Sequence, residues 1–438
     1  MLGELDYPIT YHTNKQIESE WFTMNKSILA KPTEQQLRWH DMELGMFCHF
    51  GMNTFCNQEW GIGNDSPEIF NPTELDARQW VRTAKRAGFK YFILTAKHHD
   101  GFCLWPTKTT DYSVKSSPWK NGQGDVVREV ADACREEGIA LGLYLSPWDR
   151  HEPCYADKEA YDDFYAEQLT ELLTQYGPLI EVWFDGAGSE GREYDWPRIM
   201  GLVKQHQPDA MVFNMGQPTI RWVGNEDGVA PYPCWNTSSE ARASMFTSDM
   251  LTWLPETSNW VPAECDVPIR THHWFWHPND EDSLRSLDNL LDIYYRSVGH
   301  GTVLLLNISP DDRGLFPDID VERVIEFGDE ISRRFDHPIA QTSGDGTELT
   351  LSLPYEFLVD HAIVMEQISQ GERVHEYVLE AAQDGVWIEL VHGTAIGHKK
   401  IDAFPAIRTQ QLRLTVTKYV DLPLIRFFAV YCTEIDSR

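Results

Sequence analysis

LIEVWFDGA, at residues 179–187, is the stretch that points to the fold, because an apolar, β-branched and aromatic run ends in a carboxylate followed by two small residues. The pattern predicts a buried strand that delivers Asp185 at its C-terminal end. Parallel strands covered on both faces have near-continuous apolar runs, and in barrels and doubly wound sheets the active site lies at the C-terminal strand ends. If Asp185 takes part in a reaction, other strands should also end in polar residues.

Strand and helix patterns alternate on both sides of this stretch. Apolar runs predict four more strands, and the segments between them have helical periodicity. The predicted strands are residues 44–51, 89–97, 139–146 and 210–215, and the predicted helices are 76–88, 125–138, 158–177 and 196–207. Such units imply a parallel sheet that closes into a (β/α)8-like barrel. An open, doubly wound sheet is the alternative, but no glycine-rich phosphate loop follows the first strand.

The pattern changes twice further along the chain. After residue 215 it loosens into a Trp- and Pro-rich stretch up to about residue 277, and it resumes with a helix near 283–298, a strand at 302–309 and a helix at 321–335. Residues 337–347 are rich in Gly, Ser, Thr and Asp and predict a linker or first turn. Short alternating runs beyond it predict an all-β sandwich. We therefore expect a catalytic barrel domain at 1–336 and a β-sandwich domain at 337–438.

Composition limits the possible partners and location. The chain has 37 basic and 68 acidic residues and a net charge of −31, which opposes binding to nucleic acid or an anionic membrane. Its 16 Trp residues suit a sugar or another ring-shaped ligand. Eight scattered Cys form no CxxC pair and predict no disulfide framework. With neither a signal-peptide pattern nor a transmembrane stretch, we expect a cytoplasmic protein, or a periplasmic or secreted one if a signal peptide has been removed.

Polar residues do end the predicted strands. They are His49, His98 with His99, Tyr144 and Asp185, and Trp183 lies on the same side of its strand as Asp185. Three His and an Asp could bind zinc in a barrel hydrolase. Against that reading, His49 stands alone on the first strand, and adjacent His98 and His99 point to opposite sides unless the chain bulges. Serine or cysteine nucleophiles have less support, because no Gly-x-Ser-x-Gly motif is present.

A pair of carboxylates surrounded by aromatic and His residues is the remaining option, and it is typical of glycoside hydrolases. Asp185 would be one carboxylate. Glu226, which follows the fifth strand in the loop sequence RWVGNEDG, is the first candidate for the other, and Glu264 is the second.

Five motifs taken together resemble the α-L-fucosidases of glycoside hydrolase family 29. They are MFCHFG at 46–51, Glu59-Trp60, KHHDGF at 97–102, GLYLS at 142–146 and EVWFDG at 181–186. The likeness runs in order from about residue 40 to 335. Residues 221–228, 263–270 and 397–401 resemble the subgroup of the family that prefers α-1,3- or α-1,4-linked fucose.

The resemblance implies a retaining exo-α-L-fucosidase that acts on fucosylated oligosaccharides or glycoconjugates and needs no cofactor. It implies that Asp185 is the nucleophile and Glu226 the acid/base. It places the sugar against eight further residues. These are His49, Glu59, Trp60, His98, His99, Tyr144, Trp183 and Trp274. A fucose-binding protein without catalysis and a metal-dependent barrel hydrolase are the alternatives.

Overall fold

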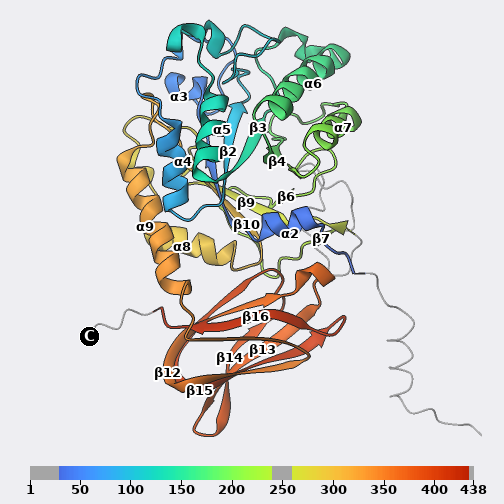
Figure 1. The fold of residues 1–438 in the computed structure, drawn as a ribbon, viewed down its shortest axis with the longest axis vertical. Helices are drawn as coiled ribbons and strands as arrows, with labels where there is room; N and C mark the ends of the chain where they lie inside the picture. Colours follow the sequence, from blue (N-terminus) through green and yellow to red (C-terminus); the bar gives the residue numbers. More distant parts are fainter. Residues whose placement is uncertain (1–28, 239–258, 434–438) are drawn as a thin grey trace, which may run out of the picture.

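The computed structural model describes residues 29–238 and 259–433, which form two stacked domains (Figure 1). The first contains parallel strands and helices, and the second contains antiparallel strands. Residues 1–28, 239–258 and 434–438 of the two predicted domains lie outside the described residues. Within the described part, no helix is long and apolar enough to span a bilayer.

Eight parallel strands form the barrel of the first domain. They are β1 (Leu44–Cys48), β2 (Tyr91–Lys97), β3 (Ala140–Leu145), β4 (Leu179–Trp183), β5 (Met211–Phe213), β6 (Arg221–Trp222), β9 (Ala263–Pro268) and β10 (Val303–Asn307). Each pairs with its neighbours in the order β5-β4-β3-β2-β1-β10-β9-β6. A parallel bridge between Phe213 and Ile220 joins the two ends of this order. The predicted (β/α)8-like barrel is therefore confirmed.

Helices connect most of the strands. They are α3 (Met52–Cys56), α4 (Ala77–Arg86), α5 (Val126–Glu137), α6 (Lys158–Gln175), α7 (Trp196–His206), α8 (Leu287–Arg296) and α9 (Asp318–Phe335). Residues 214–220, between β5 and β6, contain no helix, and the short strands β7 (Thr237–Ser238) and β8 (Asn259–Trp260) pair between β6 and β9. The Trp- and Pro-rich stretch thus supplies two barrel strands that the sequence pattern did not predict.

Side-chain caps mark the starts of five of these helices. Asp76, Asp125, Asp157, Asp195 and Ser286 each accept a hydrogen bond from a backbone N–H of the first turn. A side-chain oxygen at the N-cap accepts a hydrogen bond from a backbone N–H of the first turn, which has no partner inside the helix. Because Ser286 caps α8, that helix starts later than the predicted residue 283.

Aromatic residues fill the barrel interior. Trp39 reaches it from α2 (Glu34–His40), and it packs with Tyr91, Tyr144 and Trp183. Gly45 makes room for this cluster, since a Cβ atom there would lie 2.1 Å from the ring of Tyr91. Close packing of this kind fixes the orientation of each ring.

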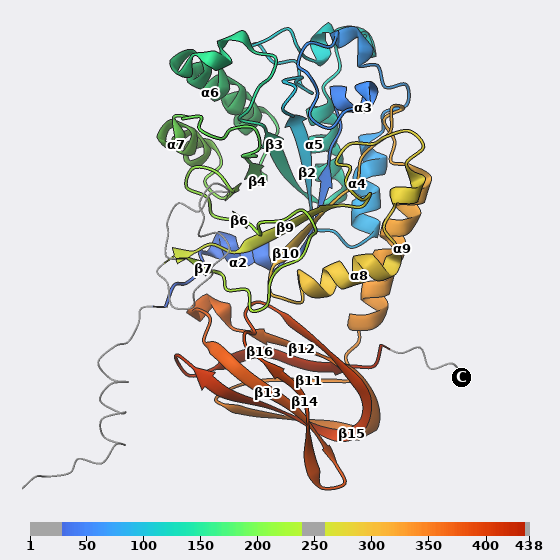
Figure 2. The same cartoon turned by 180° about the vertical axis from the view of Figure 1, so that it is seen from behind.

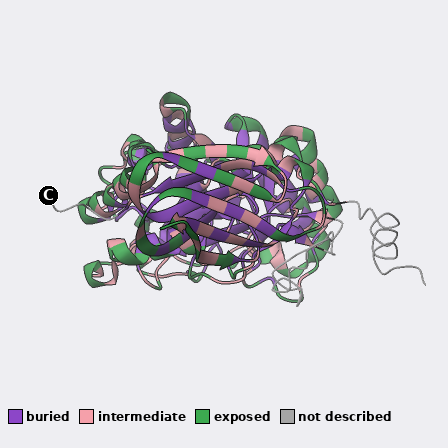
Figure 3. Cartoon of the chain, turned by 90° about the horizontal axis from the view of Figure 1, so that it is seen from below, coloured by how far each residue is buried: buried purple, intermediate pink, exposed green. Residues whose placement is uncertain are grey.

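The second domain is a β-sandwich with its own core. Its strands are β11 (Ala340–Asp345), β12 (Glu348–Glu366), β13 (Val374–Gln383), β14 (Val386–Gly393), β15 (Lys400–Tyr419) and β16 (Leu424–Tyr431). The alternating runs at 349–353 and 361–365 belong to the single long strand β12. Figure 3 shows the alternation of buried and exposed residues along these strands.

The prediction of a linker or first turn at 337–347 is wrong for residues 340–345, which form β11. Ala340 pairs with Val430, and Asp345 pairs with Leu424 of β16. Inter-strand hydrogen bonds outweigh the turn-forming composition there, and the polar side chains suit a strand at the edge of a sheet.

The sandwich packs against the N-terminal end of the barrel, as seen from behind in Figure 2. Glu43, just before β1, accepts hydrogen bonds from His398 and Lys399 of the sandwich. Arg426 of β16 forms an ion pair with Asp41 at 3.1 Å. The C-terminal ends of the barrel strands therefore lie away from the sandwich.

None of the eight cysteines forms a disulfide. Four of them, Cys48, Cys103, Cys134 and Cys265, are completely or almost completely buried in the main core. The prediction that the chain has no disulfide framework is confirmed.

Candidate active site

A pocket opens at the C-terminal ends of the barrel strands. It brings together residues from loops that are far apart in the sequence. Its lining includes nine of the ten predicted site residues: His49, Glu59, Trp60, His98, His99, Trp183, Asp185, Glu226 and Trp274. The tenth, Tyr144, is fully buried and contacts Asp185 directly.

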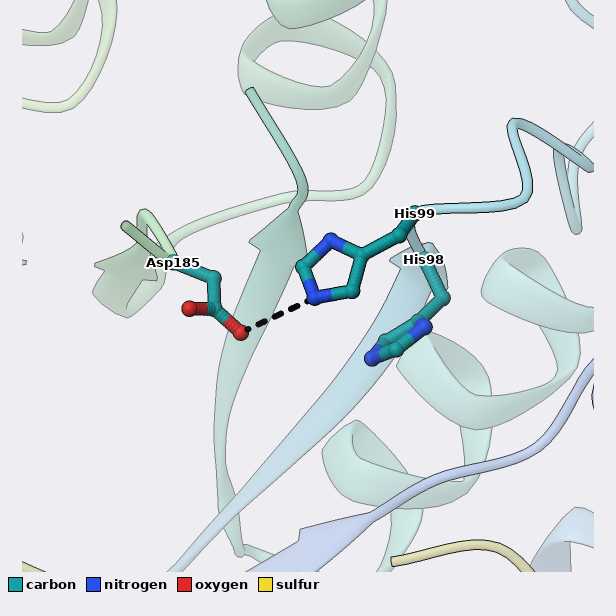
Figure 4. A group of neighbouring side chains, drawn as sticks. All are labelled: His98, His99 and Asp185. Atoms are coloured by element: carbon teal, nitrogen blue, oxygen red, sulfur yellow. Dashed lines mark ion pairs between the residues drawn. The ribbon is translucent and has the colours of Figure 1, made fainter. Parts of the chain in front are cut away.

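The carboxylate of Asp185 is held by two hydrogen bonds and lies beside His99. Tyr144 donates its phenol hydrogen to Oδ2 at 3.0 Å, and the backbone N–H of Ala187 donates to Oδ1 at 2.8 Å. Nε2 of His99 lies 3.6 Å from Oδ2 (Figure 4). The small residues after Asp185 let the chain turn back so that Ala187 reaches the carboxylate. Asp185 is thereby fixed at the pocket wall with one face open to a ligand.

His98 and His99 both lie at the pocket, although neighbours on an extended strand point to opposite sides. The pairing of β2 with β3 shifts in register between Thr95 and Lys97, and the strand ends at Lys97. The two imidazole centroids are 4.1 Å apart. This irregularity supplies the bulge that the sequence argument required for a shared site.

Hydrogen bonds from outside the pocket set the imidazole tautomers. Nδ1 of His49 lies 2.8 Å from Oδ1 of Asn307, so His49 donates there and turns an unprotonated Nε2 to the pocket. Asn53 donates to Nδ1 of His98 at 3.3 Å, which leaves the proton of His98 on Nε2. The pocket therefore offers both hydrogen-bond donors and acceptors.

His99 follows the pattern of His49. Its Nδ1 lies 2.7 Å from Oγ of Ser146, whose own hydrogen goes to the carbonyl of Trp148. Burial lowers the pKa of His49 to about 3 and also lowers the pKa of His98 and of His99. The three rings are therefore neutral at pH 7.

A loop carrying Trp274 is fixed by Glu59. The two carboxylate oxygens accept the backbone N–H of Trp274 at 2.9 Å and that of Phe275 at 3.3 Å. His277 adds a contact of 2.6 Å to the same carboxylate. Glu59 is thus largely occupied by its own chain, and its clearest role is to place Trp274 at the pocket.

Glu226 and Glu264, the two candidates for the second carboxyl group, lie in different places. Glu226 is exposed as a residue but lines the pocket from the loop after β6. Partial burial of its carboxyl, together with the charge of Asp185, raises its pKa, while a hydrogen bond from Trp274 acts in the opposite direction. Glu264 is fully buried inside the barrel, where Tyr91 and Trp183 donate to it. Only Glu226 is placed to meet a ligand in the pocket.

Several lining residues were not predicted from the sequence. They are Phe47, Ala187, Phe213, Asn214, Trp222 and Asp266. Trp222 donates to Asp266 at 2.6 Å. These two lie on β6 and β9, whose strand patterns the Trp- and Pro-rich stretch concealed. Asn307, which orients His49, follows a clear apolar run, and its place at a strand end was the available signal.

His98, His99 and Asp185 could together hold a metal ion, because one ligand atom from each lies within 4.8 Å of the others. The hydrogen bonds do not favour this. If Asn53 donates to Nδ1 of His98, then Nε2 carries a hydrogen and cannot bind a metal. Asn53 also donates to the carbonyl of Glu59 at 3.0 Å, which fixes the orientation of its amide.

A family comparison agrees with this site. The sequence profile described as "Alpha-L-fucosidase" matches residues 64–333. The chain belongs to the α-L-fucosidase family. It is a glycoside hydrolase, as its motifs predicted.

Individual relatives extend the likeness over nearly the whole chain. Alpha-L-fucosidase 1 of Arabidopsis thaliana is 41% identical over 454 residues, covering 94% of this chain and 89% of the plant protein. A glycoside hydrolase 29 family member from an unknown rumen bacterium is 39% identical with a TM-score of 0.87, covering 94% of this chain and 79% of that one. A Ruminococcus gnavus fucosidase of the same family, solved in complex with fucose, is 32% identical with a TM-score of 0.82 and covers 95% and 98%.

Proposed function

We propose that this α-L-fucosidase is a retaining, exo-acting enzyme in which Asp185 is the nucleophile and Glu226 the general acid and base. The observation that carries the proposal is that the two carboxyl groups line one pocket in different environments. Asp185 accepts two hydrogen bonds that stabilise a carboxylate, whereas the pKa of Glu226 is raised. Such a difference suits one nucleophile and one proton donor.

The reaction would proceed in two steps. An oxygen of Asp185 forms a bond to the anomeric carbon while the glycosidic bond breaks, and the leaving oxygen takes the proton of Glu226. Water then attacks the same carbon, Glu226 takes a proton from that water, and the bond to Asp185 breaks to release L-fucose. Retention of configuration requires carboxyl groups about 5–5.5 Å apart.

The remaining lining residues suit a 6-deoxy sugar. His49, His98 and His99 offer both acceptors and a donor for its hydroxyl groups. Aromatic rings of Phe47, Trp183, Phe213 and Trp274 provide apolar surface for the methyl group and the ring. The fucose complex of the Ruminococcus gnavus relative supports fucose as the ligand.

We propose α-1,3- and α-1,4-linked fucose at branch points of glycans as the substrate. The support is the resemblance of the Glu226 loop at 221–228 and of residues 263–270 to the subgroup with that preference. The test is a panel of α-1,2-, α-1,3-, α-1,4- and α-1,6-linked oligosaccharides. Faster cleavage of α-1,2-linked fucose would overturn the linkage assignment and leave the catalytic residues untouched.

Two variants and one stereochemical measurement test the mechanism. Asp185→Asn should abolish turnover but retain fucose binding. Glu226→Ala should lose most activity on natural glycans and recover part of it with azide and a substrate that has a good leaving group. Proton NMR of the first product should show the α-anomer of L-fucose, and an initial β-anomer would contradict the double displacement. Rescue by azide in Glu264→Ala instead would reassign the acid.

A further inference from the structure

Two glutamates face each other inside the barrel, below the pocket and outside the proposed chemistry. Glu181 lies on β4 between Gly142 and Met211, and Glu264 lies on β9 next to Val303. Both are 0% exposed. Neither forms an ion pair with any described residue, although burying a charge without a partner is costly.

Their hydrogen bonds show where a proton must lie. Glu264 accepts from Tyr91 at 2.7 Å through Oε2 and from Trp183 at 2.9 Å through Oε1, so both of its oxygens act as acceptors. Oε2 of Glu181 accepts from Trp39 at 3.0 Å. Oε1 of Glu181 is buried and has no hydrogen-bond partner among the described residues, and the side-chain carboxyl groups of Glu181 and Glu264 interact with each other. A hydrogen on Oε1 of Glu181, donated to Glu264, satisfies every polar atom of the pair.

We propose that Glu181 and Glu264 share a proton and form a positioning pair that holds the indole of Trp183, a wall of the fucose pocket, in place. The chain of contacts runs from Trp39 through Glu181 and Glu264 to Trp183. Trp183 in turn stacks on Phe213 with centroids 3.9 Å apart and on Tyr144 at 5.4 Å. The pair thus supports the ring that touches the sugar and, through Tyr144, the residue that holds Asp185.

The surroundings of the pair agree with a retained proton. Burial raises the pKa of Glu264 to about 7, and burial together with the charge of Glu264 raises the pKa of Glu181 well above its usual range. The titratable groups that face the pair are Tyr91 on β2 and Asp266 on β9, and the pKa of each is itself raised by burial. Among the described residues, no Lys or Arg acts on the charge of Glu181 or Glu264, so a proton is the available source of neutralisation.

The proton assignment predicts unequal effects of similar substitutions. In Glu181→Gln, the amide N–H can replace the shared hydrogen and the amide oxygen can accept from Trp39. In Glu264→Gln, one carboxylate oxygen becomes an NH2 group, so either Trp183, which can only donate, loses its acceptor, or Tyr91 must stop donating and accept instead. In Glu264→Leu, no acceptor remains for the indole. Loss of the indole's partner should loosen Trp183 and weaken sugar binding.

The first measurement is the affinity for L-fucose by titration calorimetry at pH 6, with kcat and KM on a fucosylated substrate. We expect Glu181→Gln to remain within about twofold of the parent, since it keeps every hydrogen bond, and Glu264→Gln and Glu264→Leu to bind fucose at least about tenfold more weakly. Glu366→Gln, at a buried carboxyl in the sandwich, is the control and should not change fucose affinity. Equal effects of Glu181→Gln and Glu264→Gln would overturn the assignment.

The second measurement is the melting temperature between pH 5 and 8.5. The folded parent keeps a proton that the unfolded chain loses near its usual pKa, so the parent loses stability as pH rises. Glu181→Gln has no such group, and its melting temperature relative to the parent should rise steadily with pH. A difference that does not change with pH would overturn the shared proton. The melting-temperature measurement tests the shared proton even if the proposed catalytic roles of Asp185 and Glu226 are wrong. If Glu264→Leu does not fold, Glu264→Gln takes its place in the binding measurement.

Discussion

The phenol oxygen of Tyr144 lies 3.0 Å from Oδ2 of Asp185 and donates a hydrogen bond to it. The contact follows from the barrel register, in which Tyr144 of β3 pairs with Trp183 of β4, two residues before Asp185. Tyr144 is fully buried, so water cannot replace its hydrogen. The bond links the aromatic interior of the barrel to the proposed nucleophile.

Tyr144→Phe should therefore lower kcat/KM without unfolding the protein. A hydrogen bond to a charged group is worth about 1.5–3 kcal/mol, which corresponds to about 10- to 150-fold in rate. The measurement is kcat/KM on an aryl fucoside, with the melting temperature recorded in parallel.

Tyr165→Phe is the matched control. Tyr165 is equally buried, but it donates to the carbonyl of Leu145 at 2.8 Å and does not reach the pocket. This variant should lose stability and keep its kcat/KM. If both variants lost the same activity, the contact with Asp185 would have no special role.

The pH dependence should show Glu226 as an acid whose pKa is raised. Because the protonated form donates to the leaving group, kcat/KM should fall as pH rises through that pKa. The charge of Glu59 contributes to the raised value. Glu59→Gln should therefore move the alkaline limb of the kcat/KM profile to lower pH.

Glu68→Gln provides the comparison for this shift. It removes the same charge from an exposed position shortly after Glu59 in the sequence. Its alkaline limb should coincide with that of the parent protein. An alkaline limb in Glu59→Gln that stays in place would show that Glu59 does not act on the titrating group.

Asn307→Ala should weaken fucose binding through two neighbours. Its side chain accepts from Nδ1 of His49 and donates to the carbonyl of Trp274, each at 2.8 Å. Without the Asn307 side chain, His49 can adopt the other tautomer and the loop that carries Trp274 loses a hydrogen bond. We expect the Kd for L-fucose to rise about tenfold, as for the loss of about 1–1.5 kcal/mol per buried hydrogen bond. Asn289→Ala, on the exposed side of α8, should leave the Kd unchanged.

A chelator separates the glycosidase from a metal-dependent hydrolase. The cluster of His98, His99 and Asp185 has the geometry to hold an ion, but the proposed reaction has no step that uses one. Prolonged dialysis against EDTA should leave kcat/KM unchanged. A loss of activity that zinc restores would favour the metal-dependent alternative.

Gly45→Ala should destabilise the barrel. Its Cβ atom would lie 2.1 Å from the ring of Tyr91, and overpacking of a filled core costs about 1–3 kcal/mol. Gly201→Ala is the control, because its Cβ would meet nothing within 4 Å in α7, and removing a helix glycine stabilises by about 0.5–1 kcal/mol. Denaturant unfolding of both should give changes of opposite sign.

The sequence by itself determined the barrel, the sandwich and most of the pocket. Apolar runs that end in His49, His98, Tyr144 and Asp185 carry this information locally, since a buried parallel strand needs apolar residues and its C-terminal end exposes the next polar one. Strand ends of a closed barrel meet, so the predicted residues meet as well. The sequence pattern did not reveal β6, β9 and β11, because short strands are defined by pairing partners far away in the chain.

Only the tertiary structure separates the positions of Glu226 and Glu264. Both are acidic residues among small or polar neighbours in the sequence, and nothing local separates them. In the folded chain, Glu226 reaches the pocket from a loop, and Glu264 points into the barrel towards Glu181. The direction of a side chain on a short strand depends on the register of its neighbours, since a shift of one residue turns it to the other face. The same register places Tyr144 against Asp185, a contact that no sequence motif specifies.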